Sequence, residues 1–236
     1  MRNFSDPSVG AVGAELVYRN RNSTGVGDGQ GVYWKYEKFL KSMESRITSL
    51  IGVSGCCYAV RRELYEAIPP GLISDFLIAQ IIYKKGKRVV YEPEALSCED
   101  ANENMDDEFK MRIRVGIRTL YGLFYMRSLL NPLKYGLFSL QLISHKIFRY
   151  LVPLVMLFAF FLNAALCVNN GFFIYKFLLM SQLFFYTLVI LGAGAAKKMR
   201  VLYSFYYFFI TNAALLVALF KFIAGERQRT WEPRRK

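Results

Sequence analysis

The pattern of hydrophobic and polar positions divides the chain into two parts. In the first part, a glycine-interrupted apolar run over residues 9–17 is typical of a buried strand. Apolar and aromatic residues then recur at helical spacing over residues 32–50, with lysine and glutamate on the opposite side. Residues 75–85 predict a helix that ends at Gly86 in a left-handed conformation, and residues 88–91 predict a short strand. This close succession of helix, glycine and strand indicates an α/β layer.

The second part contains three long uncharged runs. They cover residues 150–168, 177–196 and 201–220, and no acidic residue occurs between Phe109 and Gly225. At about 1.5 Å per residue, each run reaches roughly the 30 Å of a bilayer core. A soluble core would have to hold three successive helices that are apolar on every face. The pattern therefore predicts three transmembrane helices within residues 147–223.

Residues 111–146 have a mixed pattern between these two parts. Their apolar positions are interrupted by Arg114, Arg118, Arg127, Pro132 and Lys134. Alternating basic and apolar residues predict amphipathic helices that lie on the membrane surface. The alternative is a fourth span over residues 128–144, which would have to bury Lys134 and Pro132 in the bilayer.

The net charge of +13 belongs to the apolar part of the chain. Residues 1–110 hold 14 Lys and Arg against 16 Asp and Glu, whereas residues 111–236 hold 17 against two. Basic residues beside apolar runs are typical of membrane proteins, so the charge does not require nucleic acid as a partner. The basic connection 197–200 is predicted to be cytoplasmic. Three spans would then place the basic tail, residues 224–236, outside, against the positive-inside tendency.

Cysteine and histidine do not suggest a metal site. The four cysteines stand at positions 56, 57, 98 and 167 without a CxxC pair, and His145 is the one histidine of the sequence. Zinc sites need closely spaced Cys and His ligands, so none is predicted. The thiols are interpreted as reduced side chains packed among apolar residues.

Four stretches of the first part carry a resemblance to a known family. They read GVYWKYEK at 31–38, GVSG at 52–55 running into AVRREL at 59–64, ISDF at 73–76, and GKRVVYEPEA at 86–95. Together they resemble the second half of the catalytic domain of membrane-bound family 2 glycosyltransferases, relatives of the cellulose and hyaluronan synthases. The resemblance covers most of residues 3–118.

This resemblance implies a catalytic role for Asp75. In the family an acidic pair or a Thr-Glu-Asp triplet opens a helix, and its final Asp is the general base on the acceptor hydroxyl. Asp75 stands at that place, and Ser74 replaces the usual first acid. Inverting transfer needs a base because the acceptor oxygen loses its proton as it attacks C1 of the donor sugar. The alternative is that Asp75 only caps its helix.

The family's second signature, QxxRW, supplies an arginine near the donor pyrophosphate. The matching stretch of this chain reads MRIRV at 111–115, so Arg114 is the residue that the resemblance places in donor binding. A fixed positive charge there would stabilise the departing nucleotide. Alternatively, Arg112, Arg114 and Arg118 are anchors for lipid headgroups.

The nucleotide-sugar site of this family, with its DxD metal motif, lies in the first half of a GT-A fold. No DxD occurs in this sequence, and the strand at 9–17 is expected to pair with strands that would precede it. The expected fold is therefore α/β plus membrane α-helical. It consists of the C-terminal half of a GT-A-like domain (1–110), interfacial helices (111–146) and about three transmembrane helices. A divalent cation, Mg or Mn, is expected for the complete enzyme, with its ligands outside this chain.

The expected function follows from the resemblance. The chain would belong to an inverting glycosyltransferase that moves a sugar from a nucleotide-sugar donor to a glycan or lipid-linked acceptor in polysaccharide biosynthesis. Its location would be the cell membrane, multi-pass, with the catalytic part cytoplasmic. The missing half, as a separate chain, is one candidate partner. The alternative is a catalytically inactive membrane subunit, or a remnant, that serves as a scaffold.

Overall fold

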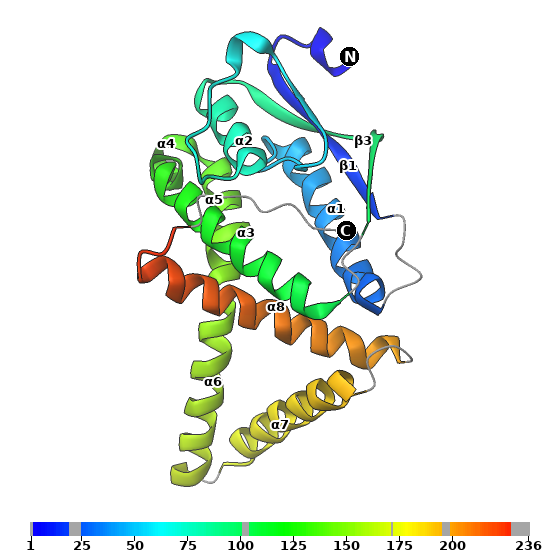
Figure 1. Cartoon of the computed structure of the whole chain (residues 1–236). Helices are drawn as coiled ribbons and strands as arrows, with labels where there is room; N and C mark the ends of the chain where they lie inside the picture. The colour runs from blue at the N-terminus through cyan, green and yellow to red at the C-terminus, as the bar shows by residue number, and fades with distance from the viewer. Residues whose placement is uncertain (1, 19–24, 101–103, 171, 195–198, 228–236) are drawn as a thin grey trace.

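The computed structural model describes residues 2–18, 25–100, 104–170, 172–194 and 199–227 (Figure 1). Within these residues the α/β part holds a sheet with the strand order β2-β1-β3. The strands are β1 (Val9–Tyr18), β2 (Tyr58–Val60) and β3 (Arg88–Glu99). The central strand β1 runs antiparallel to β2 and parallel to β3. Both described neighbours of β1 come from later in the chain, and pairing of β1 with strands that would precede it stays a prediction.

Two long helices accompany the sheet, α1 (Gly25–Ile47) and α2 (Ser74–Lys84). They correspond to the helices predicted over 32–50 and 75–85. The buried residues of α2 and the sheet share one core, formed by Ala11, Leu50, Val53, Ile78, Ala79, Ile82 and Val89. A Cβ at Gly10 of β1 would lie 2.6 Å from Ile82 Cγ2, so glycine permits the close approach of strand and helix. Gly86 has φ +76° and ends α2 as predicted.

Residues 105–142 form several consecutive helices, separated by short turns. The longest is α3 (Met105–Tyr125), whose first turn is capped by Asn104 Oδ1 accepting a hydrogen bond from the Asp107 amide. A 3-10 segment (Arg127–Leu130), α4 (Pro132–Tyr135) and α5 (Leu137–Leu142) follow. Gly136, with φ +55°, separates α4 from α5. The alternative of one spanning helix over residues 128–144 is therefore wrong, because the backbone turns at this glycine.

The remaining chain is helical and apolar. A π-helical segment (Ile143–Ile147) joins α5 to α6 (Phe148–Asn170), and α7 (Phe173–Gly194) and α8 (Arg200–Ile223) follow. Among the described residues, three helical stretches are long and apolar enough to cross a membrane: Leu137–Asn169, Phe173–Gly194 and Val201–Ile223. The expectation of three such helices is confirmed, although the first stretch starts well before residue 150.

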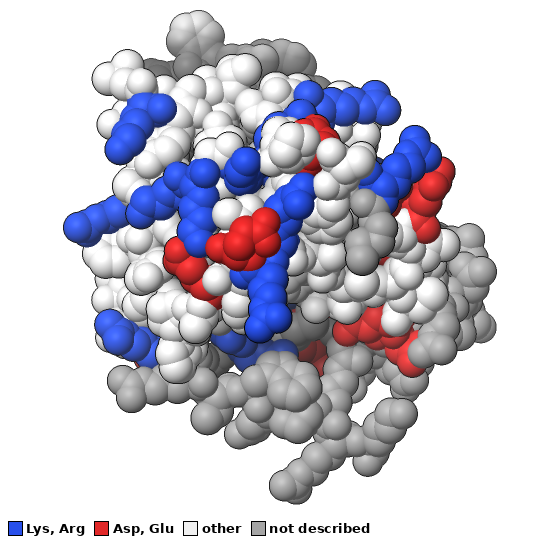
Figure 2. Space-filling view, turned by 90° about the horizontal axis from the view of Figure 1, so that it is seen from above, with Lys and Arg blue, Asp and Glu red and all other residues white. Residues whose placement is uncertain are grey.

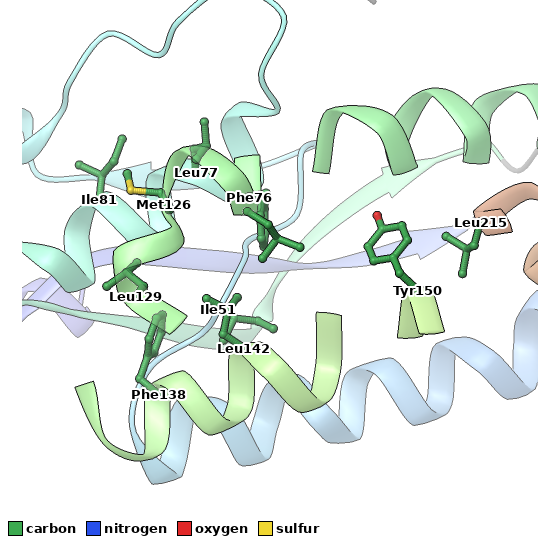
Figure 3. Close-up of a cluster of buried hydrophobic side chains, with 11 residues drawn as sticks. Ile51, Phe76, Leu77, Ile81, Met126, Leu129, Phe138, Leu142, Tyr150 and Leu215 are labelled. Carbon is green, nitrogen blue, oxygen red and sulfur yellow. The ribbon is translucent and has the colours of Figure 1, made fainter. Parts of the chain in front are cut away.

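One hydrophobic core joins these helices to the α/β part (Figure 3). Its buried members are Ile51, Phe76, Leu77, Ile81, Leu123, Met126, Leu129, Phe138, Leu142, Tyr150 and Leu215. The Tyr83 ring stacks on Phe138 with centroids 3.7 Å apart. Because α2, α3, α5, α6 and α8 all contribute, the helices after residue 110 are packed directly against the α/β part.

The face of the molecule at the end of the α/β part carries charges of both signs. Figure 2 shows lysine and arginine side chains across this face, with clusters of aspartate and glutamate among them. The mixture agrees with the nearly balanced charge of residues 1–110. Such a surface is typical of a solvated domain.

Candidate active site

Asp75 lies in the first turn of α2, where the chain enters the helix from the Pro69–Ile73 loop. The N-cap residue is Ile73, which has no side-chain cap. Asp75 Oδ1 accepts a hydrogen bond from the Phe76 amide at 2.9 Å. No described residue forms a hydrogen bond to the second oxygen, Oδ2. One oxygen thus holds the side chain in place, and the other remains available to an external hydroxyl donor.

The segment before β2 packs against this carboxylate. The Val53 amide donates to the Asp75 carbonyl oxygen at 3.0 Å, which ties the segment to the start of α2. A Cβ at Gly55 would lie 2.9 Å from Asp75 Oδ2, shorter than any ordinary contact. Because glycine has no Cβ, Asp75 Oδ2 can occupy this position.

Burial raises the pKa of Asp75 above the ordinary aspartate value of 3.8. The hydrogen bond from the Phe76 amide and the charges of Lys146 and Lys41 act in the opposite direction, but burial is the larger effect. A carboxylate with a raised pKa is a stronger base than an exposed aspartate. Position, the free oxygen and basicity all suit a general base.

Lys146 is a cation that sequence reasoning placed on the membrane surface and the structure places beside α2. It extends from the π-helical segment, and its Nζ lies 5.6 Å from the centroid of the Phe76 ring. Its charge also acts on Asp75. A π-helical turn is often found at functional sites. The signal in the sequence was the pair His145-Lys146 within an otherwise uncharged apolar stretch.

The same π-helical turn carries His145, which lies between two glutamates of α1. His145 Nδ1 is 2.6 Å from Glu44 Oε1, and His145 Nε2 is 3.5 Å from Glu37 Oε2. Both glutamates are buried. Burial raises the pKa of Glu37, but His145 and the charges of Lys146 and Arg149 outweigh it and lower that pKa overall. Glu37 and Glu44 are seven residues apart, the spacing of one helix face, which was the signal for this cluster.

The arginines of α3 have different partners. Arg112 Nε donates to Glu108 Oε1 at 2.8 Å, and Arg112 also contacts the Tyr207 hydroxyl of α8. Arg118 donates to the carbonyl oxygens of Gly71 at 3.2 Å and Leu72 at 2.8 Å. These contacts are with protein, whereas Arg112 and Arg118 were also considered as headgroup anchors.

The structure does not bring Arg114 into contact with Asp75. Arg114 has no hydrogen bond or ion pair with a described residue. The α3 arginine whose charge interacts with Asp75 is Arg118, whose pKa is lowered by burial and raised by that carboxylate. Arg118 also fixes the loop that leads into α2, a role that the sequence analysis, which considered it as a headgroup anchor, did not predict.

A pocket of about 460 Å³ adjoins this loop. It is lined by Pro69, Pro70, Gly71, Leu72, Tyr121, Phe124, Tyr125, Arg127 and Arg227. The Arg127 guanidinium lies over the Phe124 ring at 5.1 Å, and that of Arg227 lies over the Tyr121 ring at 5.4 Å. Neither arginine has an ion pair with a described residue. Two guanidinium groups beside aromatic rings suit an anionic group attached to an apolar one.

The described residues do not fit a divalent cation site. They contain no group of three or more His, Cys, Asp or Glu side chains placed to hold a metal. The buried carboxylates of Glu37 and Glu44 face His145, and that of Glu108 binds Arg112. No step of the chemistry is therefore assigned to a metal held by this part of the chain.

Similarity to known proteins is found at the level of the fold. No protein-family model matches the sequence, and no curated protein sequence matches it either. Among solved structures, the fold is similar to that of the mannosyltransferase PcManGT from Pyrobaculum calidifontis, in complex with GDP-Man and Mn²⁺, with a TM-score of 0.63 and 19% identity. The match covers 95% of this chain and 56% of that chain, so this chain spans just over half of the length of its neighbour. The chain accordingly has a glycosyltransferase-like fold, in which the small sheet is followed by three apolar helices.

Proposed function

We propose that this chain is the acceptor-side part of an inverting, membrane-bound family 2 glycosyltransferase. The complete enzyme would transfer a sugar from a nucleotide-sugar donor to a glycan or lipid-linked acceptor in polysaccharide biosynthesis. Its α/β part would lie on the cytoplasmic side of the cell membrane. Similarity to a mannosyltransferase fold and the apolar helices support this general class.

The observation that carries the proposal is the environment of Asp75. Oδ1 is held by the Phe76 amide, Oδ2 lies against Gly55 without a hydrogen bond to a described residue, and burial raises the pKa. An acceptor hydroxyl that donates to Oδ2 would be aligned for attack on C1 of the donor sugar. As the new C–O bond forms, the hydroxyl proton moves to Oδ2, and the bond from C1 to the nucleotide breaks with its electrons on the phosphate oxygen. Attack from the face opposite the nucleotide inverts C1.

Apart from Arg114, donor binding in this proposal depends on residues outside this chain. The structural neighbour holds GDP-Man and Mn²⁺, which supports a nucleotide sugar and a divalent cation, Mg or Mn, for the complete enzyme. Arg114 stays the predicted contact to the donor pyrophosphate, because it has a guanidinium without a protein partner among the described residues. Arg118 would support Asp75 through the Gly71–Leu72 loop.

The pocket beside this loop bears on the acceptor. Arg127 and Arg227 offer positive charge, and Tyr121, Phe124 and Tyr125 offer apolar surface. This composition favours a lipid-linked acceptor, in which a phosphate joins a hydrocarbon chain, over a free glycan. Arg118 connects the two regions, since it binds the loop that lines the pocket and interacts with Asp75.

Sugar transfer in membranes tests the proposal. Membranes would contain the chain alone, or the chain produced together with a donor-binding half, and would be given radiolabelled GDP-mannose and other nucleotide sugars in parallel. We expect label in the lipid or glycan fraction only when both parts are present. Transfer by the chain alone would show that it needs no separate donor half. Absence of transfer from every donor with both parts present would favour the inactive scaffold.

A further inference from the structure

Helix α8 lies beside α3 along the whole length of both helices (Figure 1). At the beginning, Tyr203 and Tyr207 pack against Met105. In the middle, a Cβ at Gly116 would lie 2.7 Å from that of Ala218. At the end, the Tyr121 and Phe222 rings meet edge to face with centroids 4.8 Å apart. The two helices therefore run in the same direction, and both must lie at the same depth relative to the membrane.

Helix α3 carries too many charges to lie in a hydrocarbon core. Asp106, Asp107 and Lys110 are exposed in its first turns. Arg114 and Arg118 follow along the helix. A charged side chain at the centre of a bilayer is energetically unfavourable. If α8 crossed the membrane, it would draw this charged helix into the bilayer with it.

The contacts of α8 also differ between its two sides. Toward α3 it directs polar groups: the Tyr207 hydroxyl donates to Glu108 Oε1 at 3.0 Å, and Arg112 contacts the same hydroxyl. On the outside, Val201, Phe208 and Phe220 have exposed fractions of 71%, 46% and 58%. A helix with one face on a polar domain and an apolar outer face is suited to the interface between bilayer and water.

We propose that α8 lies in the membrane surface beneath the α/β part, and that only α6 and α7 cross the bilayer. This departs from the span predicted over residues 201–220. Both ends of α8 then lie on the side of the α/β part. The basic connection 197–200 and the basic tail share that side, so the conflict with the positive-inside tendency disappears. The partner of the outer face is the lipid surface, because α8 continues directly from the membrane helix α7.

Labelling of single cysteines in the full chain tests the topology. The four native cysteines are free thiols and would first be replaced by alanine. Glu63→Cys would mark the α/β part, and Phe172→Cys would mark the connection between α6 and α7. Met199→Cys and Glu226→Cys would mark the start and the end of α8. With an impermeant maleimide added to one side at a time, we expect positions 63, 199 and 226 to react from one side and position 172 from the other. Reaction of position 226 from the side of position 172 would show that α8 crosses the membrane.

The depth of fluorescent labels in the bilayer gives a second, independent measurement. Labels would be placed at Val201, Phe208 and Phe220 of α8, with Phe158 in the middle of α6 as the deep reference. Quenching by lipids brominated at different depths should place the three α8 labels at the same shallow depth and the Phe158 label near the bilayer centre. A label at Phe208 as deep as that at Phe158, with Val201 and Phe220 shallow, would overturn the proposal. Both measurements are independent of sugar transfer.

Discussion

At the scale of single residues, the site depends on how closely Gly55 approaches Asp75. In Gly55→Ala the added methyl group would lie 2.9 Å from Asp75 Oδ2 and would displace the carboxylate. A displacement of about 1 Å in a catalytic group can lower a rate about 10²-fold. We expect the complete enzyme to lose transfer at least tenfold, while its thermal unfolding changes little.

A matched glycine variant controls this prediction. Gly194→Ala places its methyl group where no atom lies within 4 Å, so activity and stability should stay the same. Equal activities of Gly55→Ala and Gly194→Ala in the complete enzyme would mean that the position of Oδ2 does not matter.

The pH dependence of transfer follows from the raised pKa of Asp75. The base must be ionised, so activity falls as pH drops through its folded-state pKa, which lies above the ordinary 3.8. The pKa is higher in the folded than in the unfolded chain, so the proton stabilises the fold at low pH and this contribution is lost as pH rises through the folded pKa. Asp75→Asn should therefore not lower the unfolding temperature at neutral pH. An acidic limb of kcat/KM at the value of an exposed aspartate would contradict the assignment.

At the scale of secondary-structure elements, α1 and the π-helical segment are held together by the contact of His145 with its two glutamates. Glu44→Ala removes the carboxylate that lies 2.6 Å from His145 Nδ1 and leaves a buried ring nitrogen without its partner. Such a loss costs about 1–3 kcal/mol. We expect a lower unfolding temperature in detergent, whereas Glu63→Ala, at an exposed position, should leave it unchanged. Equal unfolding temperatures of the two variants would show that this contact does not stabilise the fold.

The elements also show how far the sequence could predict the fold. Local patterns were sufficient for α2, for its end at Gly86 and for the three apolar helices, because hydrophobic periodicity and a glycine at the end of a helix are short-range properties. The strand predicted over 88–91 extends to Glu99 because β1 provides partners up to Tyr18 after a shift in register. That extension and the packing of α8 on α3 depend on residues far apart in the sequence.

The candidate site was predictable in the same limited way. Asp75 was predicted from the family resemblance, because its position at the start of a helix alone fits a helix cap equally well. Lys146, His145 and Arg118 could not be assigned, because their roles depend on the approach of the π-helical segment and α3 to α2. A basic residue in an apolar stretch reads equally well as a membrane anchor until its partner is known.

At the scale of the whole molecule, the core in Figure 3 joins the surroundings of Asp75 to the apolar helices. Phe76, next to Asp75, packs in this core with Tyr150 of α6 and Leu215 of α8. An acceptor delivered from the bilayer would therefore meet a site whose position relative to the membrane is fixed by packing. The chain covers 56% of its structural neighbour, and the proposed donor half would complete the site opposite Asp75.

The turnover of Asp75→Asn in the complete enzyme shows whether Asp75 is the general base. Asparagine keeps the size of the side chain and its ability to accept from the Phe76 amide, but it cannot take the acceptor proton. Asp107→Asn, at an exposed position in α3, is the matched control. With equal amounts of protein in the membrane, we expect Asp75→Asn to lower kcat by about 10²- to 10⁴-fold and Asp107→Asn to leave it unchanged. Normal turnover of Asp75→Asn would contradict the account and leave Asp75 as a residue that only supports the start of its helix.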